Sequence, residues 1–132
     1  MSGINLLAVL VAALSSFLIG GLWYSPMLFG NVWNRAAGNP SKAGQGHPAK
    51  VFGLSFVFAL IAAFAYAGLV PLQNTAMTGA IQGAGIGAGL VAASFGINYQ
   101  FANRPGVMWL IDGGYHTLQF ALYGLILAVW RV

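Results

Sequence analysis

Four residues near the end of the chain have side chains that could bind a solute or carry a proton. Asp112, His116, Gln119 and Tyr123 occur at i, i+4, i+7 and i+11, so in a helix they share one face. An acid and a histidine one turn apart titrate as a coupled pair, and histidine changes charge near neutral pH. The pattern indicates a polar face that binds or conducts a small solute or a proton.

The composition places this face inside a membrane. Of the 132 residues 59% are hydrophobic and only 5% are charged, whereas soluble domains carry about 25% charged residues. A membrane-spanning helix needs about 20 apolar residues, so we expect one transmembrane domain, residues 1–132, with the lipid bilayer as its main partner. The net charge of +4 comes from five scattered basic residues, which do not form the basic stripe of a nucleic-acid-binding protein.

Enzyme and metal chemistry are not indicated. Asp112 is the only carboxylate and the chain has no cysteine, so neither a carboxylate pair nor a thiolate nucleophile is available. The two histidines, His47 and His116, are far apart in sequence, and zinc normally takes three or four ligands. We therefore expect no enzymatic activity, no cofactor and no bound metal.

Apolar stretches of the chain predict an all-α, polytopic membrane protein with four transmembrane helices. The expected spans are residues 4–23, 51–70, 76–97 and 107–130. After the first span, Ser25 can cap and Pro26 can open a short amphipathic helix at 26–37, lying in the membrane interface. An irregular loop with aromatic anchors is the alternative. Residues 39–50 have the composition of a mobile connector.

The third predicted span contains two rows of glycines at a spacing of four residues. One row is Gly79, Gly83 and Gly87, and the other includes Gly85 and Gly89. Small residues at this spacing let two helix backbones approach closely in a membrane. The rows therefore predict either packing within one subunit or a homo-oligomer interface.

Basic residues predict the orientation in the membrane. Arg35, Lys42 and Lys50 follow the first span and Arg104 precedes the fourth, while only Arg131 is expected on the opposite side. By the positive-inside rule the two basic loops are cytoplasmic and both termini are outside.

A charged group inside the bilayer needs a partner, because an unpaired acid there costs about 3 kcal/mol on insertion scales. His116 is the nearest candidate partner of Asp112, and Arg104 and Arg35 are expected on the same side. This leaves two interpretations. The polar face serves a solute or proton, or the protein is an accessory or scaffold subunit in which the Asp112/His116 pair is a structural clasp.

Two motifs resemble those of a known family. They are Trp23-Tyr24-Ser25-Pro26-x-x-Phe29-Gly30-x-x-Trp33, and Arg104-Pro105 followed by Trp109-x-x-Asp112-x-Gly114-Tyr115-His116. At this separation they resemble a bacterial family of small membrane proteins, the domain-of-unknown-function family 1761. The resemblance covers nearly the whole chain and implies a four-span protein of the bacterial inner membrane. It carries over no catalytic residues, because the family has no established activity.

Overall fold

The computed structural model describes residues 3–38 and 48–130, and every regular element in these two ranges is helical. The all-α prediction is therefore confirmed. In chain order the elements are α1 (Leu6–Trp23), α2 (Gly30–Ala36), α3 (Pro48–Leu69), α4 (Ala76–Ile86), the π-helical segment η2 (Gly87–Ala92), α5 (Ala93–Phe101) and α6 (Gly106–Val129). Most of the predicted connector, residues 39–47, lies outside the described residues.

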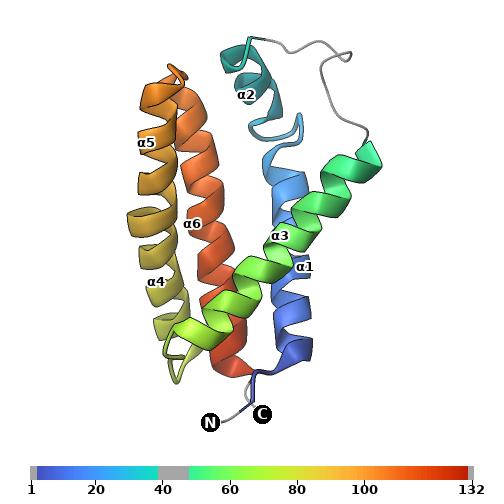
Figure 1. Ribbon diagram of the computed structural model, residues 1–132, viewed down its shortest axis with the longest axis vertical. Coiled ribbons are helices and arrows are strands. Elements are labelled where there is room, and N and C mark those ends of the chain that lie inside the picture. The colour runs from blue at the N-terminus through green and yellow to red at the C-terminus, as the bar shows by residue number, and fades with distance from the viewer. Residues whose placement is uncertain (1–2, 39–47, 131–132) are drawn as a thin grey trace.

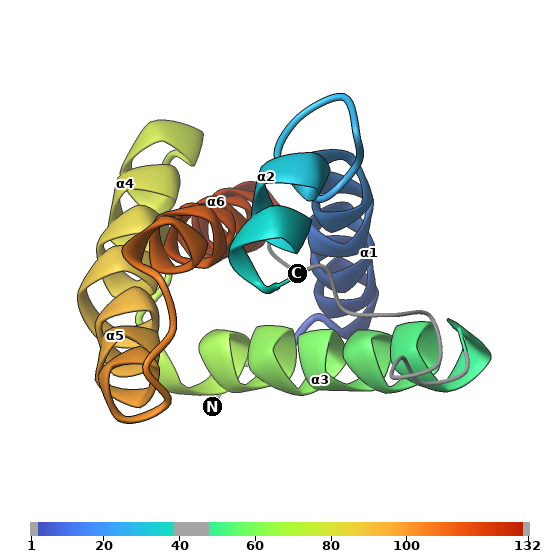
Figure 2. The same ribbon diagram turned by 90° about the horizontal axis from the view of Figure 1, so that it is seen from above.

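Helix α6 is the centre of the arrangement. Helices α4 and α5, joined by η2, run along one side of it, and α1 runs along another (Figure 1). Helix α3 crosses obliquely, so that the view from above shows it as a separate wall (Figure 2). The short helix α2 lies at the end where α1 finishes and α6 begins.

One predicted glycine row packs against α6 within the chain. A Cβ added at Gly79, Gly83 or Gly87 would overlap backbone atoms of α6, at Gly124, Phe120 and His116 respectively. The two helices therefore approach as closely as their backbones allow. Gly85 and Gly89 have no atom within 4 Å of an added Cβ, so this second row is open, and an oligomer interface there stays a prediction.

Alanines form the contact between α1 and α3. Ala12 of α1 and Ala63 of α3 are both fully buried. The hydroxyl-bearing rings of Tyr66 and Tyr123 close the core between these helices and α6. The small side chains allow α3 to cross α1 closely, and the C-terminal half of α3 stays in contact with α4 and α6 through Tyr66.

The segment after α1 that was predicted to lie in the membrane interface contains a helix, but this helix starts later than predicted. Helix α2 begins at Gly30, and the N-cap residue Phe29 makes no side-chain capping bond. The Ser25 hydroxyl instead donates to the Leu22 carbonyl at 2.7 Å, since that carbonyl at the end of α1 has lost its helical partner. The expectations that Ser25 caps a helix and that Pro26 opens it are therefore wrong.

Three of the helical segments are long and apolar enough to cross a membrane. They are Leu6–Trp23, Ala49–Leu69 and Ala76–Phe101, the last of which includes η2. Helix α6 has 24 residues but is not among them, because Asp112, His116 and Gln119 lower its hydropathy. The structure thus supports a membrane protein with three candidate spans, one fewer than the four predicted.

Candidate functional site

Asp112 is held by three aromatic donors from three different segments. The phenol of Tyr24 and the indole Nε1 of Trp33, at 3.0 Å, both donate to Oδ1, and the phenol of Tyr99 donates to Oδ2. The residue is 7% exposed. Hydrogen bonds to a carboxylate are stronger than neutral ones. Asp112 and its three donors, called the clasp from here on, therefore tie the end of α1, helix α2 and helix α5 to α6.

The Tyr24 phenol stays protonated at neutral pH. Burial raises the pKa of the Tyr24 phenol above its ordinary value, and the hydrogen bond to Asp112 raises this pKa further. Burial disfavours the phenolate because a charged group loses its hydration, and Asp112 disfavours it because a second negative charge beside the carboxylate is unfavourable. At neutral pH Tyr24 is therefore a hydrogen-bond donor to Asp112.

Two other tryptophans reinforce the same end of the bundle. Trp23 Nε1 donates to the Ile111 carbonyl at 2.8 Å, and Trp109 Nε1 donates to the Ala92 carbonyl at 2.7 Å. Ala92 is the last residue of η2. The Trp109 bond therefore ties the end of the π-helical segment to α6.

The spacing of the predicted interfacial motif, from Trp23 to Trp33, is explained by the hydrogen bonds that Tyr24 and Trp33 both donate to Asp112. Gly30 sits so close to the backbone of Tyr24 and Ser25 that an added Cβ would overlap them, and its N–H donates to the Ser25 carbonyl at 2.9 Å. The rings of Trp23 and Phe29 pack with centroids 4.7 Å apart. The tight turn sets Trp33 beside Tyr24, so that both reach Asp112.

His116 belongs to a second network. Its Nδ1 lies 2.6 Å from Gln119 Oε1, Gln119 Nε2 donates to the Tyr123 hydroxyl at 2.8 Å, and that hydroxyl donates to the Ala59 carbonyl at 3.1 Å. The imidazole stacks on Phe95 with ring centroids 4.8 Å apart and an interplanar angle of 13°. This network connects α6 to α3 and α5.

A cleft of about 620 Å³ opens beside this second network. Its walls come from α1, α3, η2, α5 and α6. The lining is mostly aliphatic and aromatic, and its polar members are Tyr24, Ser55, Tyr115, His116 and Gln119. A largely apolar hollow with a few polar groups is the usual form of a small-molecule site.

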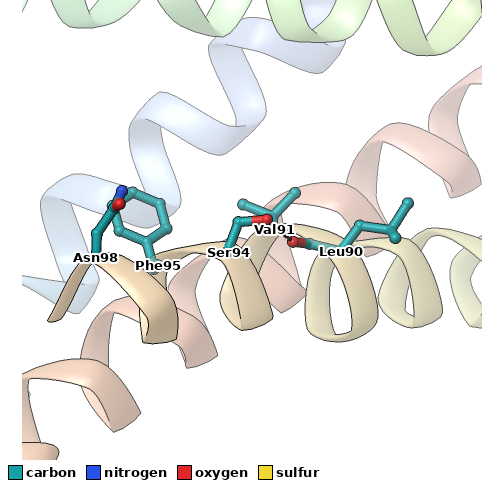
Figure 3. Close-up of a pocket in the computed structure, with 5 residues that line it drawn as sticks. All are labelled: Leu90, Val91, Ser94, Phe95 and Asn98. Atoms are coloured by element: carbon teal, nitrogen blue, oxygen red, sulfur yellow. Dashed lines mark hydrogen bonds between the residues drawn. The ribbon is translucent and has the colours of Figure 1, made fainter. Parts of the chain in front are cut away.

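The wall formed by η2 and α5 continues into a smaller hollow of about 370 Å³. Figure 3 shows its five lining residues, whose side chains project from one face of the helix: Leu90, Val91, Ser94, Phe95 and Asn98. Val91 and Phe95 also line the cleft. The two hollows are therefore neighbours.

The structure divides the four residues predicted to form one polar face. His116 and Gln119 line the cleft, whereas Asp112 and Tyr123 do not. Tyr123 is fully buried. The expectation that His116 is the partner of Asp112 is wrong, because His116 bonds to Gln119 and the carboxylate is taken by the three aromatic donors.

The predicted arginine partners are also replaced by aromatic donors. Arg104 lies in the turn between α5 and α6, where its backbone N–H donates to the Tyr99 carbonyl at 2.9 Å. The hydrogen bonds to Asp112 come from Tyr24, Trp33 and Tyr99 and not from Arg104 or Arg35. Phenol and indole groups suit this place because they satisfy the acid without burying a second charge.

Sequence reasoning missed Tyr99 and Phe95. Tyr99 stands between Asn98 and Gln100 at the polar end of the third apolar stretch. A short turn separates this end from the start of the fourth predicted span, so Tyr99 could have been predicted to lie near Asp112. Phe95 carried no signal, since a phenylalanine in an apolar helix is most simply explained by packing. Both act on α6 across the bundle.

The fold and this site define a helical protein with membrane-compatible helices, built around a clasped acid and an apolar cleft. The chain belongs to the family described as "Protein of unknown function (DUF1761)", which it matches over residues 7–128. The resemblance predicted from the two motifs is thereby confirmed. No curated protein and no solved structure shows significant similarity to the chain.

Proposed function

We propose that the protein binds a small, mostly apolar molecule that enters the cleft from the bilayer and meets His116 and Gln119 with its polar end. The observation that carries this proposal is the cleft itself, about 620 Å³ between α3 and the central helix α6. Apolar walls strip water and lipid from the body of the molecule, and the histidine and glutamine orient it.

In this proposal Asp112 has a structural role. Its carboxylate is buried and already accepts three hydrogen bonds, which leaves little hydrogen-bonding capacity for a solute. Tyr24 is the link between the two regions, because it donates to Asp112 and also lines the cleft. The clasp thus fixes one wall of the binding site.

The satisfied carboxylate also favours a second candidate function, an accessory or scaffold subunit. In that case the clasp would only hold the bundle in shape for a partner protein. Occupancy of the cleft separates the two functions, because a scaffold does not require a bound molecule.

The test of binding uses two neighbouring positions on α3. Ser55 lines the cleft, whereas the adjacent Leu54 is exposed at 47% and does not line it. The wild type, Ser55→Trp and Leu54→Trp are purified in mild detergent, and bound molecules are extracted and identified by mass spectrometry. We expect a molecule in the wild type and in Leu54→Trp that Ser55→Trp has lost. Equal extracts from all three proteins would exclude the cleft as a binding site.

We further propose a four-span topology in a bacterial plasma membrane, with α6 as the fourth span. The proposal is supported by the helix ends. Helix α2, which contains Arg35, the start of α3, which contains Lys50, and the α5–α6 turn, which contains Arg104, all lie toward the same end of the molecule, whereas α1 begins and α6 ends at the opposite end (Figure 1). By the positive-inside rule the end near α2 is cytoplasmic.

Two exposed asparagines at opposite ends of the bundle test this orientation. Asn103 lies in the turn between α5 and α6, and Asn74 lies between α3 and α4. The chain has no cysteine, so Asn74→Cys and Asn103→Cys each carry a single thiol. In intact cells an impermeant thiol reagent should label position 74 and leave position 103 unlabelled until the membrane is opened. The reverse pattern would invert the topology.

A further inference from the structure

The hydrogen atoms of the His116 network can be assigned from a fixed end. Besides Gln119, the Tyr123 hydroxyl contacts the Ala59 carbonyl at 3.1 Å and the Ser16 hydroxyl at 3.2 Å. The carbonyl can only accept, and Ser16 donates its own hydrogen to the Ala13 carbonyl at 2.9 Å, so the single hydroxyl hydrogen of Tyr123 is directed to one of these two acceptors. The Tyr123 oxygen must then accept from Gln119, whose amide Nε2 lies 2.8 Å away. Gln119 consequently presents its carbonyl oxygen to His116.

This assignment sets the state of the imidazole. Nδ1 of His116 faces the Gln119 carbonyl oxygen at 2.6 Å, so Nδ1 carries the hydrogen and donates it. In the neutral ring the other nitrogen, Nε2, is then an acceptor with a free lone pair. The acceptors beside Tyr123, the Ala59 carbonyl and the Ser16 hydroxyl, thus determine through two side chains which nitrogen of His116 can accept.

Nε2 is open to the cleft. It makes no hydrogen bond to any described residue, and within that part of the chain every buried side-chain nitrogen or oxygen has a partner. Nε2 is therefore accessible, on the wall that His116 contributes to the cleft. Stacking on Phe95 fixes the plane of the ring, so the acceptor has a defined direction.

The remaining described lining offers no counter-ion for a charged group. Among the described residues that line the cleft, none is Lys, Arg, Asp or Glu. Two of its phenols are already committed, Tyr24 to Asp112 and Tyr115 to the Ser16 carbonyl at 3.0 Å. An ionised headgroup would lose its hydration here without gaining a counter-ion, which is costly in an apolar site.

We propose that the cleft selects a neutral, membrane-soluble molecule that carries a hydroxyl on a long apolar body, and that His116 Nε2 accepts the hydrogen of this hydroxyl. This inference rests on the proposed binding function and names its ligand class. Ionised lipids and pure hydrocarbons are disfavoured, the former for want of a counter-ion and the latter for want of a donor to Nε2.

The experiment compares two probes with the same dodecyl chain, in one of which a methyl group replaces the hydroxyl hydrogen. The intact protein is released from detergent micelles containing equal amounts of 1-dodecanol and dodecyl methyl ether, and native mass spectrometry measures the two one-to-one adducts. One neutral hydrogen bond contributes about 1 kcal/mol, so we expect the alcohol adduct to exceed the ether adduct about fivefold. In His116→Phe, which keeps a ring on Phe95 but has no acceptor, the ratio should fall to about one.

The outcomes separate the ligand class from the binding function. Equal adducts in the wild type, both lost in Ser55→Trp, would overturn the hydroxyl selection and leave binding in the cleft intact. A preference for the alcohol that persists in His116→Phe would overturn the role of Nε2. Absence of both adducts, together with equal extracts from Ser55→Trp and Leu54→Trp, would overturn the binding function as well. The comparison on the wild type holds even if His116→Phe does not fold.

Discussion

Asp112 and His116 lie one turn apart on α6, yet their side chains belong to two separate hydrogen-bond networks. The carboxylate binds donors from α1, α2 and α5, while the imidazole binds Gln119 and stacks on Phe95 beside the cleft. One residue fastens helices together and the other faces a hollow. Substitutions at the two positions should therefore differ in kind.

Removing the charge of Asp112 should weaken the bundle without abolishing binding. In Asp112→Asn one carboxylate oxygen becomes an amide NH₂, which cannot accept from the aromatic donor it faces. The loss of charge-assisted hydrogen bonds should lower the free energy of unfolding by about 3 kcal/mol. Thermal unfolding in detergent, followed by circular dichroism, measures this change.

His116→Phe is the matched comparison, because it changes the polar residue one turn later. We expect it to lower stability by only about 1 kcal/mol, while removing the preference for an alcohol over an ether. An Asp112→Asn protein of unaltered stability that no longer binds the alcohol would reverse the two assigned roles.

Two glycines of the same helical segment should respond in opposite ways to an added methyl group. Gly83→Ala would drive a Cβ into the Phe120 backbone, so we expect a loss of about 1–3 kcal/mol. Gly85→Ala meets nothing within 4 Å and should raise stability by about 0.5–1 kcal/mol through better helix propensity. Denaturation of both variants in the same detergent checks the pair. A large loss in Gly85→Ala, together with a change in oligomeric state, would show that the open row is an interface.

Alkaline pH should release the clasp through Tyr24. The pKa of this phenol is raised in the folded state, from the ordinary value of 10.0, so folding retains a proton that the unfolded chain loses. Its contribution to stability is therefore complete below about pH 10 and decreases as the pH rises further. Above pH 10 the free energy of unfolding of Tyr24→Phe should fall less steeply with pH than that of the wild type. The difference between the two slopes should be at most the value that corresponds to the release of one proton. Parallel curves would contradict the assignment.

Trp33 should control the attachment of α2. Trp33→Phe keeps an aromatic ring beside Tyr24 but removes the indole donor to Asp112, so we expect faster hydrogen exchange across Gly30–Ala36. Trp130→Phe is the control, because Trp130 follows the far end of α6 and its backbone carbonyl keeps its bond from Asn5. Faster exchange of α2 in the control alone would refute the attachment.

The sequence was informative about helices and about where polarity is concentrated. Apolar length predicted the positions of α1, α3, the α4 to α5 rod and α6, and the spacing of Gly79, Gly83 and Gly87 predicted close packing. Both are properties of a single segment, readable along the chain. The sequence did not indicate which of the two glycine rows packs against α6 and which, at Gly85 and Gly89, is left open, because both rows consist of small residues at the same spacing.

The partners of the site were not predictable in the same way. Nothing in the spacing of Asp112 and His116 reveals that Tyr24, 88 residues away, supplies a donor to the acid. Whether a pair at i and i+4 meets depends on side-chain directions and on what the neighbouring helices offer. Here three aromatic side chains donate to the carboxylate, and Gln119, one turn further along α6, binds the imidazole.

The central place of α6 has a consequence for how the protein is made. Every element that α6 holds precedes it in the chain, including the donors Tyr24, Trp33 and Tyr99 and the glycine row of α4. During synthesis these groups are made before their partners exist. Assembly is therefore completed only when α6, the last of these helices, has emerged from the ribosome, and until then the earlier helices lack Asp112, the acceptor to which their aromatic side chains donate.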